Sequence, residues 1–162
     1  MRVVLQRVTQ AAVEIEGAEV ARVGKGFLLL VGVARGDDER VVTQAARKIA
    51  GLRLFEDAAG RMNLDLATVG GGLLVVSQFT LLADASRGRR PSFEGAAASE
   101  LAEPLLELFV ELLRREGLTV ATGRFGARMK IKLLNDGPVT LVLDFPGSPG
   151  SPGPAESPES PG

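Results

Sequence analysis

The sequence predicts an α+β fold, with seven or eight strands and two long helices in a single domain. Short apolar runs indicate strands, and two stretches with apolar residues at helical spacing indicate helices. The chain has 162 residues, of which 45% are apolar, and this is enough for one continuous core. We expect this domain at residues 1–145. Residues 146–162 hold six of the nine prolines and are expected to form a disordered tail.

Eight segments have the pattern of strands. Alternation of apolar and polar residues at Arg2 to Val8 and Ala12 to Glu16 predicts a hairpin. The continuously apolar run Gly26 to Val33 is typical of a strand covered on both faces. The remaining predicted strands are Glu19 to Val23, Leu73 to Val76, Leu118 to Ala121, Ala127 to Leu134 and Val139 to Phe145.

Two segments have the pattern of helices. The first is capped by Asp37 or Asp38 and stops at Gly51, and the second spans Ser99 to Glu116. Pro104 lies in or just after the first turn of the second helix, near the positions where proline is tolerated. The apolar stripes that we expect to be buried are Val41, Val42, Ala45 and Ile49 in the first helix and Leu101, Leu105, Leu108, Leu112 and Leu113 in the second.

Two helices are too few to cover both faces of such a sheet. An exposed apolar face on a small domain commonly meets a partner, and a symmetric dimer is the most frequent arrangement. We therefore expect a homodimer.

The composition restricts the possible chemistry. The chain contains no cysteine and no histidine, which excludes thiol nucleophiles, zinc sites of the Cys/His type and Ser-His-Asp mechanisms. Catalysis would have to use hydroxyls, carboxylates, Lys, Arg, backbone amides or the substrate itself. We expect no metal and no cofactor.

The hydropathy pattern gives no sign of a membrane segment. No apolar run reaches the roughly 18 residues that cross a bilayer. The N-terminal segment Met1 to Arg7 becomes polar too early for a signal peptide. We expect a soluble, cytoplasmic protein with no membrane partner.

The pair Gly137-Pro138 stands between two predicted strands. Proline cannot donate to a sheet ladder, so the pair must form a turn, a bulge or a specially shaped loop. Asn135 and Asp136 precede it, and Asn-Asp-Gly-Pro is also ordinary turn chemistry. The residues alone do not decide between a cis and a trans bond.

Polar residues follow the buried strand at Leu73 to Val76. The segment Ser77 to Thr80 offers two hydroxyls, an amide side chain and backbone N–H groups. Together these groups could hydrogen-bond the carbonyl of a ligand and the oxyanion that forms from it. An equally simple interpretation is a strand end with satisfied hydroxyls. Arg7, on the face of Val3 and Leu5, is either a solvated strand end or a cation turned toward a carbonyl acceptor.

Six segments are informative when taken together: Leu5 to Val8, Met62 to Leu64, Val76 to Leu81, Arg90 to Phe93, Thr122 to Met129 and Asn135 to Thr140. Any one of them could arise by chance, but six in this order could hardly do so. Together they resemble the D-aminoacyl-tRNA deacylase family, whose members include the D-Tyr-tRNA deacylases, across residues 1–145.

The resemblance implies a barrel-like, antiparallel sheet in a homodimer, and an enzyme that hydrolyses the ester between a D-amino acid and the terminal adenosine of tRNA. It implies that L-aminoacyl-tRNA is rejected and that glycyl-tRNA is accepted. The resemblance implies that the catalytic residues are Ser77, Gln78, Phe79 and Thr80 of one subunit.

In the same family pattern, the chiral selector is a cis Gly137-Pro138 pair of the other subunit, braced by Arg7. The residues expected at the tRNA end and its adenine are Phe125, Gly126, Ala127, Met129 and Lys130. On charge alone, Arg87, Arg89 and Arg90 join Lys130 as candidates for contacts with the acceptor backbone.

Two mechanisms are open for Thr80. It is either a nucleophile, although its surroundings in the sequence supply no activating base, or a neighbour of backbone amides that stabilise an oxyanion while the RNA 2′-hydroxyl assists water. We prefer the second, with Gln78 positioning the substrate. The competing functions are a glycine or L-alanine editing deacylase of the same fold and a non-catalytic dimeric RNA- or DNA-binding module.

Overall fold

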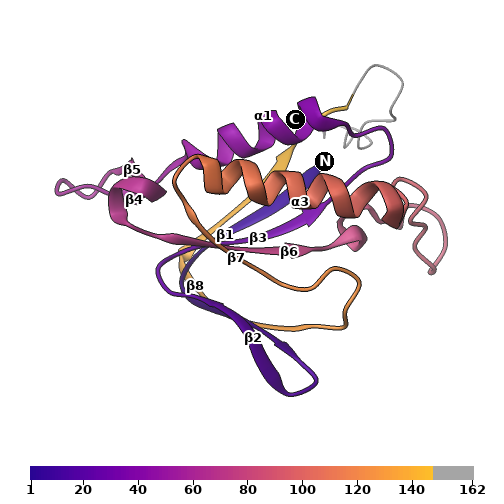
Figure 1. The fold of residues 1–162 in the computed structure, drawn as a ribbon, viewed down its shortest axis with the longest axis horizontal. Coiled ribbons are helices and arrows are strands. Elements are labelled where there is room, and N and C mark those ends of the chain that lie inside the picture. Colours follow the sequence, from indigo (N-terminus) through magenta and orange to yellow (C-terminus); the bar gives the residue numbers. More distant parts are fainter. Residues whose placement is uncertain (148–162) are drawn as a thin grey trace, which may run out of the picture.

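The computed structural model describes residues 1–147, so the disorder expected for the tail falls almost wholly on residues outside the described part. Eight strands and two long helices form one α+β unit (Figure 1). The helical elements are α1 (Glu39–Ala50), α2 (Leu66–Val69), α3 (Ser99–Arg115) and the 3₁₀ turn η1 (Phe79–Leu82). The strands are β1 (Arg2–Ile15), β2 (Ala18–Val23), β3 (Gly26–Gly32), β4 (Arg53–Glu56), β5 (Met62–Asp65), β6 (Gly72–Ser77), β7 (Thr119–Thr122) and β8 (Lys130–Asp144).

The main sheet is mixed rather than purely antiparallel. Its order is β2-β1-β3-β6-β7, with β8 also paired to β1. Strands β3, β6 and β7 run parallel, whereas β1 pairs antiparallel with β2, β3 and β8. The strands β4 and β5 form a separate small hairpin, which projects at one end of the molecule (Figure 1).

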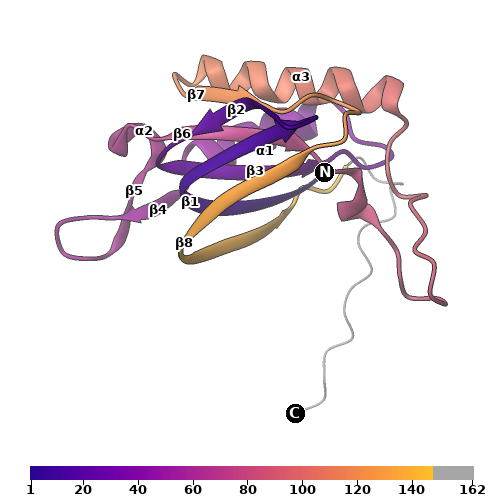
Figure 2. The same cartoon turned by 90° about the horizontal axis from the view of Figure 1, so that it is seen from below.

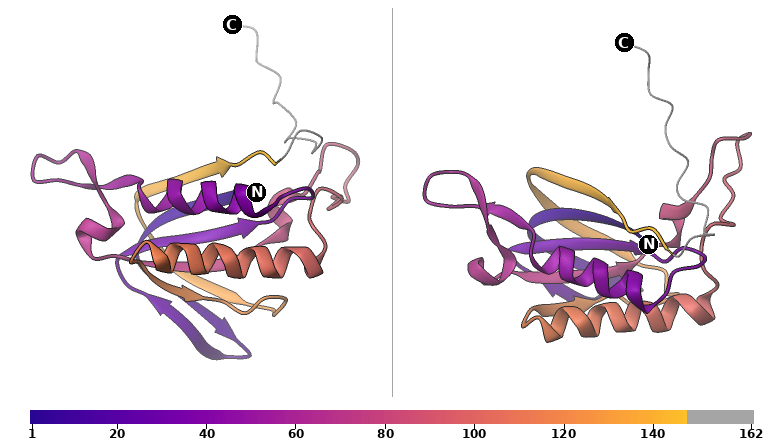
Figure 3. Two further views of the ribbon diagram at one scale, coloured as in Figure 1. Left: turned by 45° about the horizontal axis from the view of Figure 1, so that its top comes forward. Right: turned by 90° about the horizontal axis from the view of Figure 1, so that it is seen from above.

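Both long helices lie on the same side of the sheet (Figure 3). Asp38 caps α1 by accepting hydrogen bonds from the backbone N–H groups of Arg40 and Val41, and the helix stops at Gly51, as expected. Of the predicted leucine stripe of α3, Leu113 is fully buried and Leu105, Leu108 and Leu112 pack partly buried against the core, but Leu101 is 65% exposed, so its predicted burial is wrong. The buried positions of α3 also include Ala102, Phe109 and Val110, which the leucine spacing did not predict.

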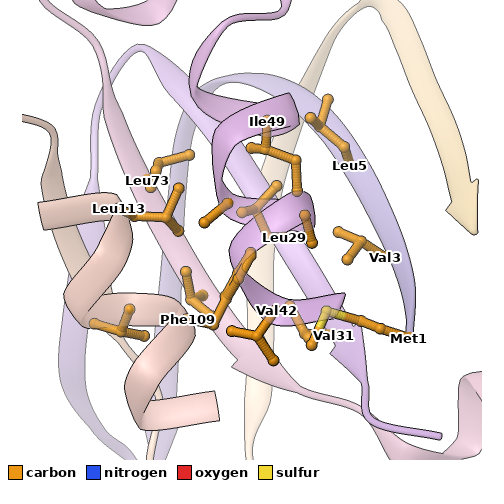
Figure 4. Close-up of a cluster of buried hydrophobic side chains, with 14 of the residues drawn as sticks. Met1, Val3, Leu5, Leu29, Val31, Val42, Ile49, Leu73, Phe109 and Leu113 are labelled. Atoms are coloured by element: carbon orange, nitrogen blue, oxygen red, sulfur yellow. The ribbon is translucent and has the colours of Figure 1, made fainter. Parts of the chain in front are cut away.

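The larger core cluster fills the space between these helices and the sheet (Figure 4). Phe109 and Leu113 of α3 and Val42 and Ile49 of α1 are fully buried there. The strands contribute Val3, Leu5, Phe27, Leu29, Val31, Leu73 and Val75.

The second face of the sheet is not bare, contrary to the expectation. It carries a second buried cluster that includes Leu28, Leu74 and Val76, packed against Met129 and Ile131. The sheet curls so that β8 and the segment before it cover this face (Figure 2). The result is the nearly closed, barrel-like sheet, and one argument for a dimer is thereby lost.

Two predicted breaks are absent. The expected hairpin between Arg2 to Val8 and Ala12 to Glu16 is one continuous strand, β1, which changes partner from β3 to β2 along its length. The predicted strands on either side of Gly137-Pro138 likewise form one strand, β8. Irregular pairing between β1 and β8 near Val8 accommodates the interruption, as bulges do.

No helix within residues 1–147 is long and apolar enough to span a bilayer.

Candidate active site

A pocket of about 570 Å³ opens at the carboxyl end of the parallel strands, the edge at which open α/β sheets commonly bind ligands. One wall begins where β6 ends, at Ser77, and continues through Gln78 and Phe79. The opposite wall is the segment before β8. Its lining residues include Phe125, Gly126, Ala127 and Met129, so the structure brings together two segments that the sequence placed in one site.

The backbone leaves the sheet directly after Ser77. Val31 of β3 lies opposite Ser77 in the parallel ladder, and its carbonyl oxygen accepts a 2.8 Å hydrogen bond from the Gln78 N–H. The chain then turns into η1, which begins at Phe79. The first N–H groups of a helical turn have no partner within it. Within residues 1–147, no backbone carbonyl accepts from the N–H groups of Phe79 or Thr80.

The side chains of Gln78 and Thr80 contact each other. The Gln78 amide donates a hydrogen bond to Oγ1 of Thr80. The side chain that contacts the Thr80 hydroxyl is therefore an amide, which is not a base that could remove its proton. Thr80 itself is exposed beside the pocket and does not line it.

An aromatic pair borders the pocket. The rings of Phe79 and Phe93 meet edge to face, with centroids 5.2 Å apart. Both remain accessible, at 56% and 37% exposure. Aromatic faces of this kind suit stacking against a nucleobase.

Among the described residues, no titratable side chain lines the pocket. Besides the residues already named, the lining consists of Val33, Val76, Ala96, Ala97, Ala98, Ser99, Ala102 and Ile131. Polar chemistry at this surface is therefore restricted to hydroxyls, one amide and the backbone. Within residues 1–147 no group of three acidic, histidine or cysteine side chains is arranged to hold a metal ion.

Several lining residues were not predicted. Phe93 belongs to Arg90 to Phe93, one of the six segments that resemble the family. Its membership in that segment is the sequence feature that could have predicted it in the site. Ala96 to Ala98 could not be found from the sequence, because their place depends on pairing of the 95–97 segment with residues 33–35. Lys130, which was predicted at the tRNA end, begins β8, is exposed and lies outside the lining.

Gly137 and Pro138 form a second cluster with Arg7. The bond between them is cis, which confirms the expectation from the resemblance. The Arg7 side chain is buried, donates from Nη1 to the Leu54 carbonyl at 2.6 Å and from Nε to the Asp136 carbonyl at 3.3 Å. The interpretation of Arg7 as a solvated strand end is therefore wrong.

Further hydrogen bonds fix the same backbone. The Asn135 amide donates to the carbonyls of Arg7 and Val139, each at 3.0 Å. A Cβ at Gly137 would lie 2.9 Å from the Val139 nitrogen, so the segment has no room for a side chain at that position. Gly137 and Pro138 are themselves exposed.

The two clusters lie apart within one chain. Arg7 pairs with Phe27 of β3, and Phe27 pairs with Leu73, four residues before Ser77 on β6. Four residues along a strand and two strands across the sheet each correspond to roughly 10 Å or more. Neither Gly137 nor Pro138 lines the pocket.

Sequence comparison relates the whole described domain to known proteins. The profile of a family described as D-Tyr-tRNA(Tyr) deacylase matches residues 4–144. A protein of Chlorobaculum parvum named D-aminoacyl-tRNA deacylase is 55% identical over 147 residues, which is 90% of this chain and 99% of the relative. A protein of the same name from Thermomicrobium roseum is 56% identical over 144 residues, or 89% of this chain and 94% of the relative.

Solved structures agree on the fold. One, named "c-Myc DNA Unwinding Element Binding Protein", aligns with a TM-score of 0.84 at 37% identity, over 91% of this chain and all of the other. A second, described as a probable eukaryotic D-amino acid tRNA deacylase, has a TM-score of 0.75 over 88% of this chain and 97% of its own. At 18% identity the second shows the fold alone. On the profile match and the identity to its relatives, the chain belongs to the D-Tyr-tRNA(Tyr) deacylase family.

Proposed function

We propose that this protein is a homodimeric, cytoplasmic D-aminoacyl-tRNA deacylase. Water adds to the ester carbonyl between a D-amino acid and the terminal adenosine of tRNA, and the adenosine hydroxyl leaves, giving free tRNA and the D-amino acid. The names of relatives at 55% and 56% identity support this reaction. The observation that carries the proposal is the pocket itself, which has amide, hydroxyl and backbone N–H groups but no titratable side chain among the described residues.

Catalysis rests on backbone donors and on the substrate. The N–H groups of Phe79 and Thr80 stabilise the negative charge that develops on the ester oxygen. Removal of one such donor in an oxyanion site typically costs about 10²- to 10³-fold in rate. Since none of the described lining side chains can act as a base, the neighbouring 2′-hydroxyl of the RNA assists the attacking water. Gln78 positions the substrate through its amide, and Ser77 supplies a further hydroxyl beside the carbonyl.

The terminal adenine occupies the wall formed by Phe125, Gly126, Ala127 and Met129. These residues present small, apolar surfaces to a flat base, and Phe79 and Phe93 border the same pocket. Lys130 is exposed nearby and serves the phosphate backbone rather than the base.

Chirality is selected by main-chain oxygens of the partner subunit. The carbonyls of its Gly137-Pro138 segment accept from the ammonium group of the substrate, in charge-assisted hydrogen bonds worth roughly 1.5 to 3 kcal/mol each. They also occupy the space that the Cβ of an L-amino acid would need. Overlap with rigid backbone rejects the wrong enantiomer more strongly than attraction to the right one. Glycine has no Cβ and is accepted.

The bracing of this segment supports a rigid selector. Arg7 donates to the Asp136 carbonyl and Asn135 donates to the carbonyls of Arg7 and Val139. The exposure of Gly137 and Pro138 and their distance from the pocket of the same chain support a contribution in trans.

The outer side of β8 supplies apolar area for the contact between subunits. Leu134 and Val142 are 56% and 62% exposed there. A monomer mass that does not change with concentration in sedimentation would contradict the dimer.

The proposal is tested with three esters. We expect rapid release of D-tyrosine from D-Tyr-tRNA and no measurable hydrolysis of L-Tyr-tRNA or L-Ala-tRNA. Hydrolysis of L-Ala-tRNA at a comparable rate would favour an editing deacylase of the same fold. Binding of tRNA or DNA without turnover of any ester would favour a non-catalytic nucleic-acid-binding module, the function that the name of one structural neighbour suggests.

A further inference from the structure

Three arginines lie in one exposed loop between η1 and α3. Asp84 and Ser92 close the loop with two reciprocal backbone hydrogen bonds of 2.8 Å. A carboxylate oxygen of Asp84 also accepts from the Ser86 N–H at 2.9 Å. The base of the loop is therefore fixed, while its tip carries Arg87, Arg89 and Arg90, all exposed.

None of these three guanidinium groups forms an ion pair with an acidic group in the part of the chain that is described. Hydrogen bonds from Ser86 and, more weakly, the charge of Arg87 hold the pKa of the Asp84 carboxyl below its usual value, but Arg87 and Asp84 are not within ion-pairing distance. Three like charges within four positions repel one another, and an anionic ligand relieves that repulsion. Guanidinium groups bind phosphate oxygens in a bidentate manner.

Some other surface arginines form ion pairs within the protein. Arg22 is 2.7 Å from Glu19, and Arg2 is 2.8 Å from Asp144. Their charges are already balanced within the protein, whereas those of the loop remain available to a ligand.

The loop borders the pocket at both of its ends. It leaves η1, whose first residue Phe79 lines the pocket, and it returns to Phe93, which lines the pocket as well. Figure 2 shows the loop projecting past the end of the sheet beside η1. A polymer whose terminal group is bound in the pocket must leave it near one of its rims, and this loop forms the rim beside Phe79 and Phe93.

The pocket itself cannot bind a phosphate through charge, because none of its described lining side chains is cationic. On the opposite wall, the lining residues Phe125, Ala127 and Met129 alternate in the sequence with the exposed cations Arg124, Arg128 and Lys130. The arginine loop therefore continues the pocket on its aromatic side, whereas Arg124, Arg128 and Lys130 adjoin the opposite wall in the sequence.

We propose that Arg87, Arg89 and Arg90 bind the phosphates of the single-stranded RNA that leads to the terminal adenosine. This assignment rests on the proposed function, because it takes the ester end of the RNA to lie in the pocket. It separates two tasks. The loop supplies affinity for the nucleic acid, and the Ser77 to Thr80 segment acts on the ester.

The test compares two substrates over a range of salt concentrations. The variant R87Q/R89Q/R90Q is assayed on D-Tyr-tRNA and on a minimal ester, D-tyrosyl-adenosine, which has no phosphate. Each phosphate contact on a single strand adds about 0.7 to the slope of log affinity against log salt, so three contacts add about 2. Between about 50 and 200 mM salt, kcat/KM of the unaltered protein on D-Tyr-tRNA should therefore fall about 20-fold more than that of the variant.

The matched control removes three positive charges elsewhere. Arg47 and Lys48 end α1 and Arg115 ends α3, at the far end of α3 from the residues that line the pocket. The variant R47Q/K48Q/R115Q should keep the full salt slope on D-Tyr-tRNA, and both triple variants should hydrolyse D-tyrosyl-adenosine at the unaltered rate.

Three results would overturn the assignment. They are an unchanged salt slope in the loop variant, an equal change in the control variant, and an equal loss on D-tyrosyl-adenosine. If the unaltered protein hydrolyses neither ester, the proposed function fails. In that case the salt dependence of tRNA binding is measured by fluorescence anisotropy on the same variants. This measurement tests independently whether the loop arginines contact phosphates.

Discussion

At the scale of single residues, the site depends on where polar groups are placed rather than on reactive side chains. The absence of histidine and cysteine could be read directly from the sequence, and it already restricted the groups that could catalyse a reaction. The role of Arg7 could not be read, because both of its interpretations fit the same alternation of residues. Its burial and its bond to the Leu54 carbonyl depend on strand β4, in which Leu54 lies 47 residues away in the chain.

Thr80 gives a prediction at this scale. Thr80→Val keeps the shape of the side chain and removes the oxygen that accepts from Gln78. We expect the single-turnover rate on D-Tyr-tRNA to fall by less than about a thousandfold, a barrier change below roughly 4 kcal/mol. Thr80→Ser, which retains a hydroxyl, is the matched control. A larger loss in Thr80→Val that serine restores would make Thr80 the nucleophile.

At the scale of elements, the strands and helices were largely predictable, whereas their interruptions were not. Two long strands were each expected as two shorter ones, because Thr9-Gln10 and Gly137-Pro138 break the apolar alternation. A bulge lets a strand continue through such a break, and it depends on the partner strand rather than on the local sequence. The short hairpin of β4 and β5 has too few apolar residues to give a pattern.

The contact between β3 and β6 gives a prediction at the scale of elements. This parallel pair places Ser77 beside Val31, and it begins where Gly26 packs on Gly72. A Cβ at position 26 would lie 1.8 Å from the Gly72 carbonyl oxygen, so Gly26→Ala must separate the two strands. We expect a loss of at least about 2 to 3 kcal/mol in the free energy of unfolding, measured with urea.

Gly24→Ala is the matched control for this change. A Cβ at position 24 meets nothing within 4 Å, so its effect should stay within about 0.5 kcal/mol. Equal stability of the two variants would mean that the strands do not approach as closely as described.

At the scale of the whole molecule, the curling of the sheet was beyond prediction from the sequence. It depends on pairing between β1 and β8, whose partners Arg2 and Asp144 are 142 positions apart. Contacts of such separation leave no local pattern. The family resemblance supplied the barrel-like shape that alternation and composition alone did not.

The contacts that join the N-terminal residue Met1 to Asp37 and Phe145 give a stability prediction. The Met1 ammonium group lies 2.8 Å from the Asp37 carboxylate and 2.9 Å from the Phe145 carbonyl, and both charged groups are buried. Asp37→Asn leaves a buried cation without its counter-charge, which typically costs about 3 to 5 kcal/mol. Asp144→Asn removes the exposed partner of Arg2 and should cost less than about 1 kcal/mol in the same urea titration. Equal losses would show that the ammonium pair is not buried.

The central claim is that a pocket lined by no titratable side chain, among the residues described, leaves part of the catalysis to the RNA. Its most direct test is the single-turnover hydrolysis of D-Tyr-tRNA ending in adenosine against the same tRNA ending in 2′-deoxyadenosine. Loss of the assisting hydroxyl should lower the rate by about a thousandfold or more, roughly 4 kcal/mol, while the affinity for the tRNA stays unchanged. Equal rates on the two tRNAs would contradict this mechanism.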